Sequence, residues 1–323
     1  MGKKIIGLDI GGTTIKIAIL DEDAKILFRW IIPTNHEDCG AYILEEIWQS
    51  VSNRLNMLKI KKNSILGIGV GAPGLIDDKT GIVLEAVNIG WANYHLIDDL
   101  KELSQLPVFL ENDANLAALG ENWKGGGKKA RNMITVTLGT GVGCGIIANG
   151  EILHGANGTA GEIGHVTMDA QGYLCNCGRV GCLDTIASAT GIVHQALDII
   201  QNEPKSDLAR YYRKKSKIDA KDIFVLAESG DFLAKEIVEH TSEVLGRSLA
   251  FTATIINPTK IILGGGVSAA GKALLHKVSK YFHQYTLPRI SAVCNIEMAQ
   301  LGNDAGIIGA VYLVEKNLND VVA

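Results

Sequence analysis

The sequence predicts an α/β protein with two lobes, each built on a mixed sheet flanked by helices. Its 323 residues exceed the usual size of one hydrophobic core. Short apolar runs of strand length alternate with longer runs at helical spacing. One order of runs and glycine turns occurs near the start of the chain and again after residue 131. We therefore expect two duplicated sheets, with a cleft between the lobes.

The first sheet begins with three apolar runs separated by two turns, which predict antiparallel strands. They cover Lys3–Ile10, Thr14–Leu20 and Lys25–Ile32. Apolar side chains at helical spacing over Ala41–Leu58 predict a helix, and a continuous apolar strand follows over Ile65–Val70. A helix that crosses between two strands is typical of an α/β fold.

The second sheet repeats this order. Its first three predicted strands are Asn132–Leu138, Val142–Ala148 and Glu151–Leu153. Helical sequence follows between Leu183 and Pro258, including the predicted helices Ala187–Ile200 and Phe232–Ile256. Their apolar surface is enough to cover a sheet or a partner subunit. A strand over Lys260–Leu263 and a helix over Ala305–Val314 end the pattern.

Composition excludes several classes of protein. With 47% hydrophobic and 20% charged residues the chain is globular rather than disordered. The net charge is −4 and no polybasic run occurs, which argues against nucleic acid as a main partner. No apolar run reaches the roughly 18 residues of a membrane span. The first strand begins at once and leaves no room for a signal peptide, so we expect a cytoplasmic protein.

Three glycine turns follow predicted strands and suit the phosphates of a nucleotide. They lie in Asp9–Thr14, Leu138–Gly143 and Leu263–Val267. Glycine lets backbone amides approach phosphate oxygens, and the third turn is expected to open a helix at Ser268. Asp9 could hold hydrated magnesium. A single turn of this kind could be an ordinary hairpin, but three together favour a nucleotide; none is a P-loop, because no Gly-Lys-Ser/Thr follows.

The segment Glu111–Asn115 joins a short strand, Val108–Leu110, to a helix. Ligands of open α/β sheets bind at the carboxyl ends of strands. Phosphoryl transfer to an alcohol needs a carboxylate that accepts the hydroxyl proton. Asp113 is the candidate base and Asn112 would orient a sugar. The alternative is that Asp113 only caps the helix.

Four soft ligands lie close together in the sequence, which predicts a structural zinc site. They are His165, Cys175, Cys177 and Cys182. One imidazole and three thiolates complete a tetrahedral zinc site with no open position. The alternative is three unrelated buried thiols. Such a loop would carry Glu162 and Asp184 towards the cleft. The remaining thiols, Cys39, Cys144 and Cys294, are expected to be small core residues.

Two further turn clusters lie in the first lobe, Gly71–Gly74 and Asn88–Trp91. They could be plain turns, or they could present backbone groups and one amide to a sugar.

On these motifs the chain resembles the bacterial glucokinases of the ROK family, within the actin-like (ribonuclease H-like) ATPase superfamily. The resemblance covers nearly the whole chain and is most specific at Asp9–Thr14, Glu111–Asn115, Gly161–His165 and Cys175–Asp184. It implies that Asp113 is the catalytic base and that dimers are common among similar enzymes. Because no linker separates the lobes, we expect a hinge near Glu111–Ala114 and Gly302–Gly306, with lobes of residues 1–112 plus 305–323 and of residues 113–304.

The resemblance also implies the groups that bind each ligand. The sugar hydroxyls would be held by Asn112, Glu162, His165 and Asp184, with further contacts from Gly74 and Asn88. ATP would be surrounded by Gly11, Gly12, Thr13, Thr140, Gly141, Gly264 and Gly265, with Lys16 nearby. Zinc would be bound by His165, Cys175, Cys177 and Cys182. The family usually has Glu where this chain has Asp184, which puts the identity of the hexose in question.

The expected reaction is transfer of the γ-phosphoryl group of Mg-ATP to the 6-hydroxyl of glucose. Within the same class, N-acetylmannosamine, mannose or fructose is the alternative substrate. From another class, ROK relatives include sugar-responsive repressors, which carry a helix-turn-helix ahead of the first glycine turn. Only eight residues precede Asp9 here, so we expect a kinase.

Overall fold

A computed structural model describes residues 2–77 and 79–320, which form two compact units. The first unit comprises Met1–Lys128, Ile152–Ala160 and Asn303–Ala323. The second comprises Lys129–Glu151 and Gly161–Gly302. Among the described residues, no helix is both long enough and apolar enough to span a membrane. The functional lobes expected from the sequence, divided at residues 112 and 304, stay a prediction.

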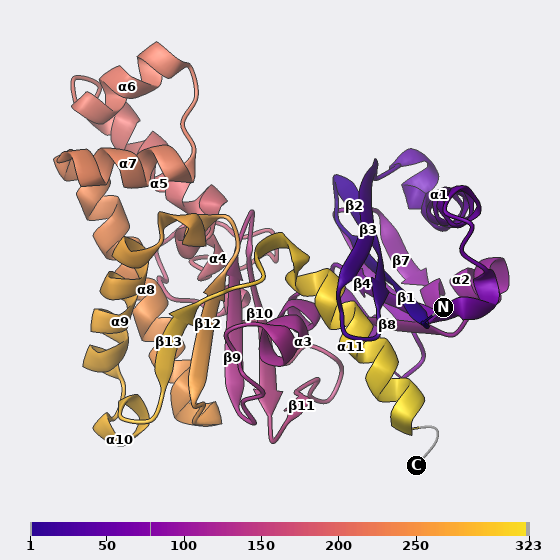
Figure 1. Cartoon of the computed structure of the whole chain (residues 1–323). Helices are drawn as coiled ribbons and strands as arrows, with labels where there is room; N and C mark the ends of the chain where they lie inside the picture. Colours follow the sequence, from indigo (N-terminus) through magenta and orange to yellow (C-terminus); the bar gives the residue numbers. More distant parts are fainter. Residues whose placement is uncertain (1, 78, 321–323) are drawn as a thin grey trace. The chain divides into compact units, whose positions relative to one another are not determined.

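The sheet of the first unit has the strand order β3-β2-β1-β4-β8 (Figure 1). Its strands are β1 (Lys4–Ile10), β2 (Thr14–Asp21), β3 (Ile26–Pro33), β4 (Ile65–Ala72) and β8 (Val108–Asn112). The first three pair antiparallel, as predicted, and β4 and β8 add parallel to β1. Asp9 of β1 is in register with Gly71 of β4, and Gly71 with Glu111 of β8. The register therefore aligns three of the predicted motifs at one edge of the sheet.

In the described part of the chain, four α-helices complete this unit: α1 (Ile43–Met57), α2 (Leu96–Ser104), α3 (Asp113–Lys124) and α11 (Ala305–Asp320). Ile6 and Leu8 of β1 share one apolar core with Ile43 of α1. The intervening Gly7 faces Ile307 of α11, because successive residues of a strand point to opposite faces. Helix α11 therefore covers the face of the sheet opposite to α1.

Glycines let α11 pack closely against its neighbours. A Cβ on Gly69 of β4 would lie 2.2 Å from the carbonyl oxygen of Ala310. A Cβ on Gly309 would lie 1.9 Å from the carbonyl oxygen of Leu116 in α3. Any side chain at these two positions would meet rigid backbone, so these glycines let the backbone of α11 lie directly against the backbones of β4 and α3.

The second sheet has the order β11-β10-β9-β12-β13, which matches the first strand for strand. Its strands are β9 (Met133–Leu138), β10 (Val142–Ala148), β11 (Glu151–Ile152), β12 (Lys260–Gly264) and β13 (Asn295–Met298). Again the hairpin pair, here β9 and β10, is antiparallel, and two strands, β12 and β13, add parallel to it, with β11 at the edge beside β10. The predicted duplication is confirmed in topology.

The described part of the second unit also contains helices. They are α4 (Asp184–Ala187), α5 (Ala189–Asn202), α6 (Asp207–Lys215), α7 (Ala220–Ser229), α8 (Phe232–Ile256), α9 (Lys272–Tyr285) and α10 (Pro288–Ser291). Helix α8 has the limits predicted for it, and α5 is shifted by two residues. Gly246 lets α8 approach α9, because a Cβ there would lie 2.6 Å from the Cβ of Tyr281.

Three details differ from the sequence predictions. A small sheet of β5 (Leu75–Asp77), β6 (Ile82–Ala86) and β7 (Trp91–Tyr94) was not predicted. The helix expected to open at Ser268 is wrong: Val267–Ala270 is a single 3-10 turn, and Gly271, at φ 67°, separates it from α9. Cys39 is exposed rather than part of a core, because it lies in a surface turn at φ 56°; Cys144 and Cys294 are buried, as predicted.

Candidate active site and metal centre

The turn between β1 and β2 is held closed by hydrogen bonds from the chain around it. Gly11 N donates to Thr14 O at 3.0 Å, and Thr34 donates from Oγ1 to Gly11 O at 2.6 Å. A Cβ on Gly12 would lie 3.2 Å from Cβ of Asn88, so the predicted sugar residue Asn88 lies against the glycine turn. The turn is thus a fixed array of backbone groups rather than a loose loop.

Charges of both signs lie beside this turn. Lys16 Nζ lies 2.8 Å from Asp9 Oδ2, and the two side chains are 34% and 18% exposed. Gly306, near the start of α11, approaches the same carboxylate, since a Cβ there would lie 3.6 Å from Asp9 Oδ2. The structure therefore brings together the predicted phosphate residues Asp9, Gly11, Gly12, Thr13 and Lys16 at the end of β1.

At the junction of β8 and α3, the residue that caps the helix and the candidate base are different residues. Asn112 is the N-cap: its Oδ1 accepts from Ala114 N at 2.9 Å and from Asn115 N at 3.3 Å. Its Nδ2 donates to Gly74 O at 3.1 Å, which joins two predicted sugar residues. Asp113 is the first residue of α3 and is exposed, with Oδ1 accepting from Ala114 N at 2.8 Å. The alternative that Asp113 serves only as the helix cap is therefore wrong, because Asn112 caps α3.

The turn between β9 and β10 is the counterpart of the first glycine turn. Gly139 N donates to Gly141 O at 2.9 Å. The N-terminus of α5 braces it, because Thr190 Oγ1 donates to Thr140 O at 2.9 Å. Asp184 braces it as well: its Oδ1 accepts from Val142 N at 2.6 Å. Asp184, predicted to hold a sugar, therefore has one oxygen on the turn predicted to hold phosphate.

The third glycine turn lies next to the second on the same sheet. Gly264 of β12 is in register with Thr137 of β9. Gly265 has φ 85°, and a Cβ there would lie 2.5 Å from the backbone of Leu138, so only glycine fits. Parallel neighbouring strands end at one edge, so the predicted ATP residues Thr140, Gly141, Gly264 and Gly265 are gathered there.

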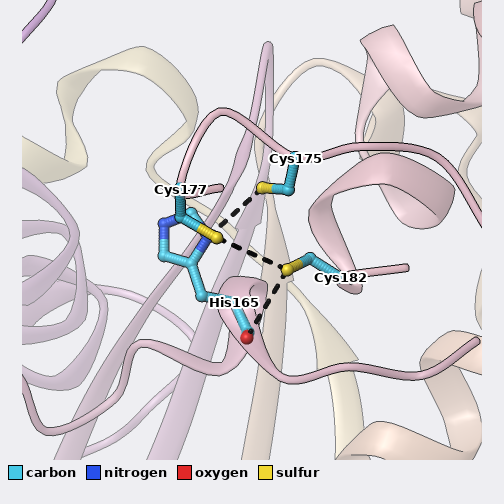
Figure 2. A group of neighbouring side chains, drawn as sticks. All are labelled: His165, Cys175, Cys177 and Cys182. Carbon is cyan, nitrogen blue, oxygen red and sulfur yellow. Dashed lines mark hydrogen bonds between the residues drawn. The ribbon is translucent and has the colours of Figure 1, made fainter. Parts of the chain in front are cut away.

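The four predicted zinc ligands converge on one point (Figure 2). Their ligand atoms all lie within 4.8 Å of one another. Cys175 Sγ is 3.6 Å from His165 Nδ1, and Cys177 Sγ is 3.6 Å from Cys182 Sγ. Tetrahedral zinc bonds of about 2.3 Å to sulfur and about 2.0 Å to nitrogen separate two sulfurs by about 3.8 Å and sulfur from nitrogen by about 3.5 Å. The arrangement therefore fits a tetrahedral metal ion.

The environment of the three thiols differs. Burial raises the pKa of Cys182 to about 12 and also raises the pKa of Cys175. Cys177 is exposed, and a hydrogen bond from the backbone of Arg179 lowers the pKa of its thiol. Since metals bind thiolates, Cys177 offers the most accessible ligand of the three.

His165 lies between the cysteine cluster and Glu162. Its Nδ1 faces Cys175, whereas its Nε2 lies 3.9 Å from Glu162 Oε2. A metal on Nδ1 would leave the ring proton on Nε2, where it can be donated to a carboxylate or a hydroxyl. One side chain can therefore serve both as a metal ligand and as a polar contact for a sugar.

One neighbour of these motifs was missed by sequence reasoning. His154 Nε2 lies 2.7 Å from Oε2 of Glu111, the residue that precedes Asn112 and Asp113. Nothing in the spacing of the sequence signals this contact, because 43 residues separate the two.

Comparisons with known proteins agree along the whole chain. The model of the ROK family matches residues 5–317. A glucokinase from Halalkalibacterium halodurans is 48% identical over 317 residues, 98% of this chain and 96% of that protein. A ROK family glucokinase from Streptomyces griseus, solved in complex with glucose and AMPPNP, has a TM-score of 0.80 at 33% identity, with 97% and 99% of the two chains covered. The xylose repressor of Caldicellulosiruptor bescii is more distant, 29% identical over 96% of this chain and 77% of the repressor.

Proposed function

This chain belongs to the ROK family, and from that membership we propose that it is an ATP-dependent glucokinase. It transfers the γ-phosphoryl group of ATP to the 6-hydroxyl of D-glucose. The observation that carries the proposal is the exposed carboxylate of Asp113, set at the start of α3 by a neighbour that supplies the helix cap. A sugar-responsive repressor is the weaker alternative, because the kinase relative is both more similar and matched over nearly its full length.

Asp113 acts as the general base. It accepts the proton of the sugar hydroxyl as that oxygen attacks the γ-phosphorus, and the bond from phosphorus to the bridging oxygen of ADP breaks. Asn112 orients the sugar while its own side chain stays fixed between α3 and Gly74. The conformation of the base therefore depends on a cap that does not itself react.

The glycine turns hold ATP. Backbone amides of Gly11, Gly12 and Thr13, and of Thr140 and Gly141, face the phosphates, and Gly264 and Gly265 lie beside the rest of the nucleotide. Lys16 contributes positive charge. Asp9 is a suitable ligand for hydrated magnesium, since its carboxylate is partly exposed beside the turn. Magnesium would neutralise part of the charge on the transferred group.

The sugar hydroxyls are bound by the residues predicted for them. Glu162, His165 and Asp184 accept or donate hydrogen bonds to hydroxyls, and Gly74 and Asn88 add further contacts. Zinc on His165, Cys175, Cys177 and Cys182 holds the loop that carries Glu162; its role is structural, because no position is left open. Asp184 is one methylene shorter than the usual Glu and already bonded to Val142, so another hexose such as N-acetylmannosamine, mannose or fructose is the alternative substrate.

Two further properties belong to the proposal. Phe251 and Ile255 of α8 are 53% and 82% exposed, and we expect a second copy of the chain to cover them in a homodimer. Sedimentation equilibrium of the wild type and of Ile255→Lys tests this, and a monomeric wild type would contradict it. The substrates ATP and free hexose imply a cytoplasmic enzyme.

Coupled ADP release on a panel of hexoses tests the reaction. We expect the highest kcat/KM with glucose; no turnover on any hexose would refute the proposed activity. Asp113→Asn keeps the size of the side chain and removes the base, so kcat should fall about 10²- to 10⁴-fold. Normal activity of this variant would exclude Asp113 as the base.

A further inference from the structure

Glu111 is a buried carboxylate that the proposed mechanism does not use. It is 4% exposed. Its Oε1 accepts from Asn112 N and from Asn115 Nδ2, both at 2.9 Å, and its Oε2 lies 2.7 Å from His154 Nε2. A carboxylate withdrawn from water is stable only when its oxygens are hydrogen-bonded. Glu111 is therefore held in one orientation by three groups, two from nearby residues and one from a residue 43 positions away.

The groups that Glu111 binds flank the proposed base on both sides. Asn112 precedes Asp113 and caps α3, and Asn115 lies two residues after it. A rotation of the Glu111 side chain would release the backbone of Asn112 and the side chain of Asn115 together. The position of Asp113 thus depends on Glu111, through the residues on either side of it.

His154 reaches Glu111 from a distant segment. It belongs to Ile152–Ala160, the stretch that follows β11 and is part of the first unit. That stretch is itself folded: Ala160 N donates to His154 O at 3.1 Å, and Gly158, at φ 82°, lies against the carbonyl of Ile76. The same segment runs directly into Gly161 and Glu162. A single short segment of the chain therefore contains both His154, which contacts Glu111, and Glu162, which is proposed to bind the sugar.

We propose that His154 is a positioning residue for phosphoryl transfer. Through Glu111 it holds the Asn112–Asp113 turn in the orientation that the base requires. Without a donor at Nε2, Oε2 of Glu111 would be buried without its closest partner, and the carboxylate would turn away to find another. This inference rests on the proposed kinase function, but its structural half can be tested without any substrate.

Two polar variants of His154 separate the effect of its hydrogen bond to Glu111 from the effect of its packing. Gln places an amide N–H about where Nε2 of His lies, whereas Asn is one methylene too short to reach Glu111. His154→Gln should keep kcat for glucose phosphorylation within about threefold of wild type. His154→Asn should lower kcat about 10- to 100-fold, the scale expected for one lost hydrogen bond to a charged group, with the KM for ATP nearly unchanged.

Amide hydrogen exchange of the peptide that spans residues 108–120 gives the second readout. We expect faster exchange in His154→Asn than in wild type and wild-type protection in His154→Gln. The inference would be overturned if both variants had the same kcat, or if residues 108–120 were equally protected from exchange in both. It would also be overturned if His154→Asn lowered the melting temperature but left kcat and exchange unchanged. If the wild type phosphorylates no hexose while the exchange difference is present, the proposed function fails and the positioning of the turn stands.

Discussion

Gly141→Ala tests the contact between Asp184 and the second glycine turn. A Cβ at this position would lie 2.8 Å from Asp184 Oδ1, a separation that real Cβ atoms essentially never show. Gly141 does not have a positive φ, so alanine fits the backbone and the carboxylate must move instead. Its movement breaks the 2.6 Å hydrogen bond from Val142 N.

The size of the effect follows from that bond. A hydrogen bond to a charged group contributes about 1.5 to 3 kcal/mol, which corresponds to about 10- to 150-fold in kcat/KM. We expect kcat/KM for ATP, measured at saturating glucose, to fall by that factor. Gly139→Ala is the matched control in the same turn, since its Cβ would meet a single atom at 4.0 Å; it should stay within about threefold of wild type.

A double-mutant cycle with Asp184→Ala identifies the cause. If alanine at position 141 acts by displacing the carboxylate, it should cost little once Asp184 is gone, and the double variant should resemble Asp184→Ala. Losses that multiply would refute this reasoning, because alanine would then be acting on the nucleotide itself. An equal loss in Gly139→Ala would refute it too.

Three other predictions concern stability. Cys177→Ser should lower both the zinc content, about one per chain in wild type by elemental analysis, and the melting temperature; metal-free wild type would contradict the site. Hydrogen bonds from Lys277 and Tyr281 lower the pKa of Glu239 to about 2 in the folded protein. Ionised Glu239 should therefore stabilise the folded protein by about 1 kcal/mol, a small value because the site is partly exposed. This contribution should be present above pH 4.5 and be lost as the pH falls towards 2. Melting temperatures of wild type and Glu239→Gln should therefore converge as the pH falls; a constant difference would exclude this. Gly309→Ala should lower the free energy of unfolding in urea by about 1 to 3 kcal/mol or more, because its Cβ would overlap the backbone of Leu116. Gly266→Ala is the control and should leave the free energy of unfolding unchanged, since a Cβ there meets no atom within 4 Å.

The regular elements were predictable because each carries its own local signal. Apolar runs between glycine turns gave β1 to β3 and β9 to β11, and a long run at helical spacing gave α8 with its observed limits. The strands β5 to β7 have three to five residues each, too few for alternation to stand out from a loop. The helix expected to open at Ser268 begins only at Lys272, because Gly271, at φ 67°, interrupts the helical backbone.

Within the site, spacing revealed ligands but not their partners. The close spacing of Cys175, Cys177 and Cys182 predicted a cluster that the structure contains. Whether Asn112 or Asp113 caps α3 could not be decided from sequence, because both are good caps and only the backbone geometry selects one. The contact between Asp184 and Val142 joins residues 42 apart, so it depends on the folded chain.

The nested order of the two units has a consequence for synthesis on the ribosome. The sheet of the first unit is complete once β8 has emerged, but α11, which covers β4 and α3, is translated only after the second unit. Until then Gly69 and the rest of that face have no helix to pack on. During the translation of the second unit the nascent chain therefore carries a first unit that lacks one of its helices, and the first unit can be completed only after the second has been synthesised.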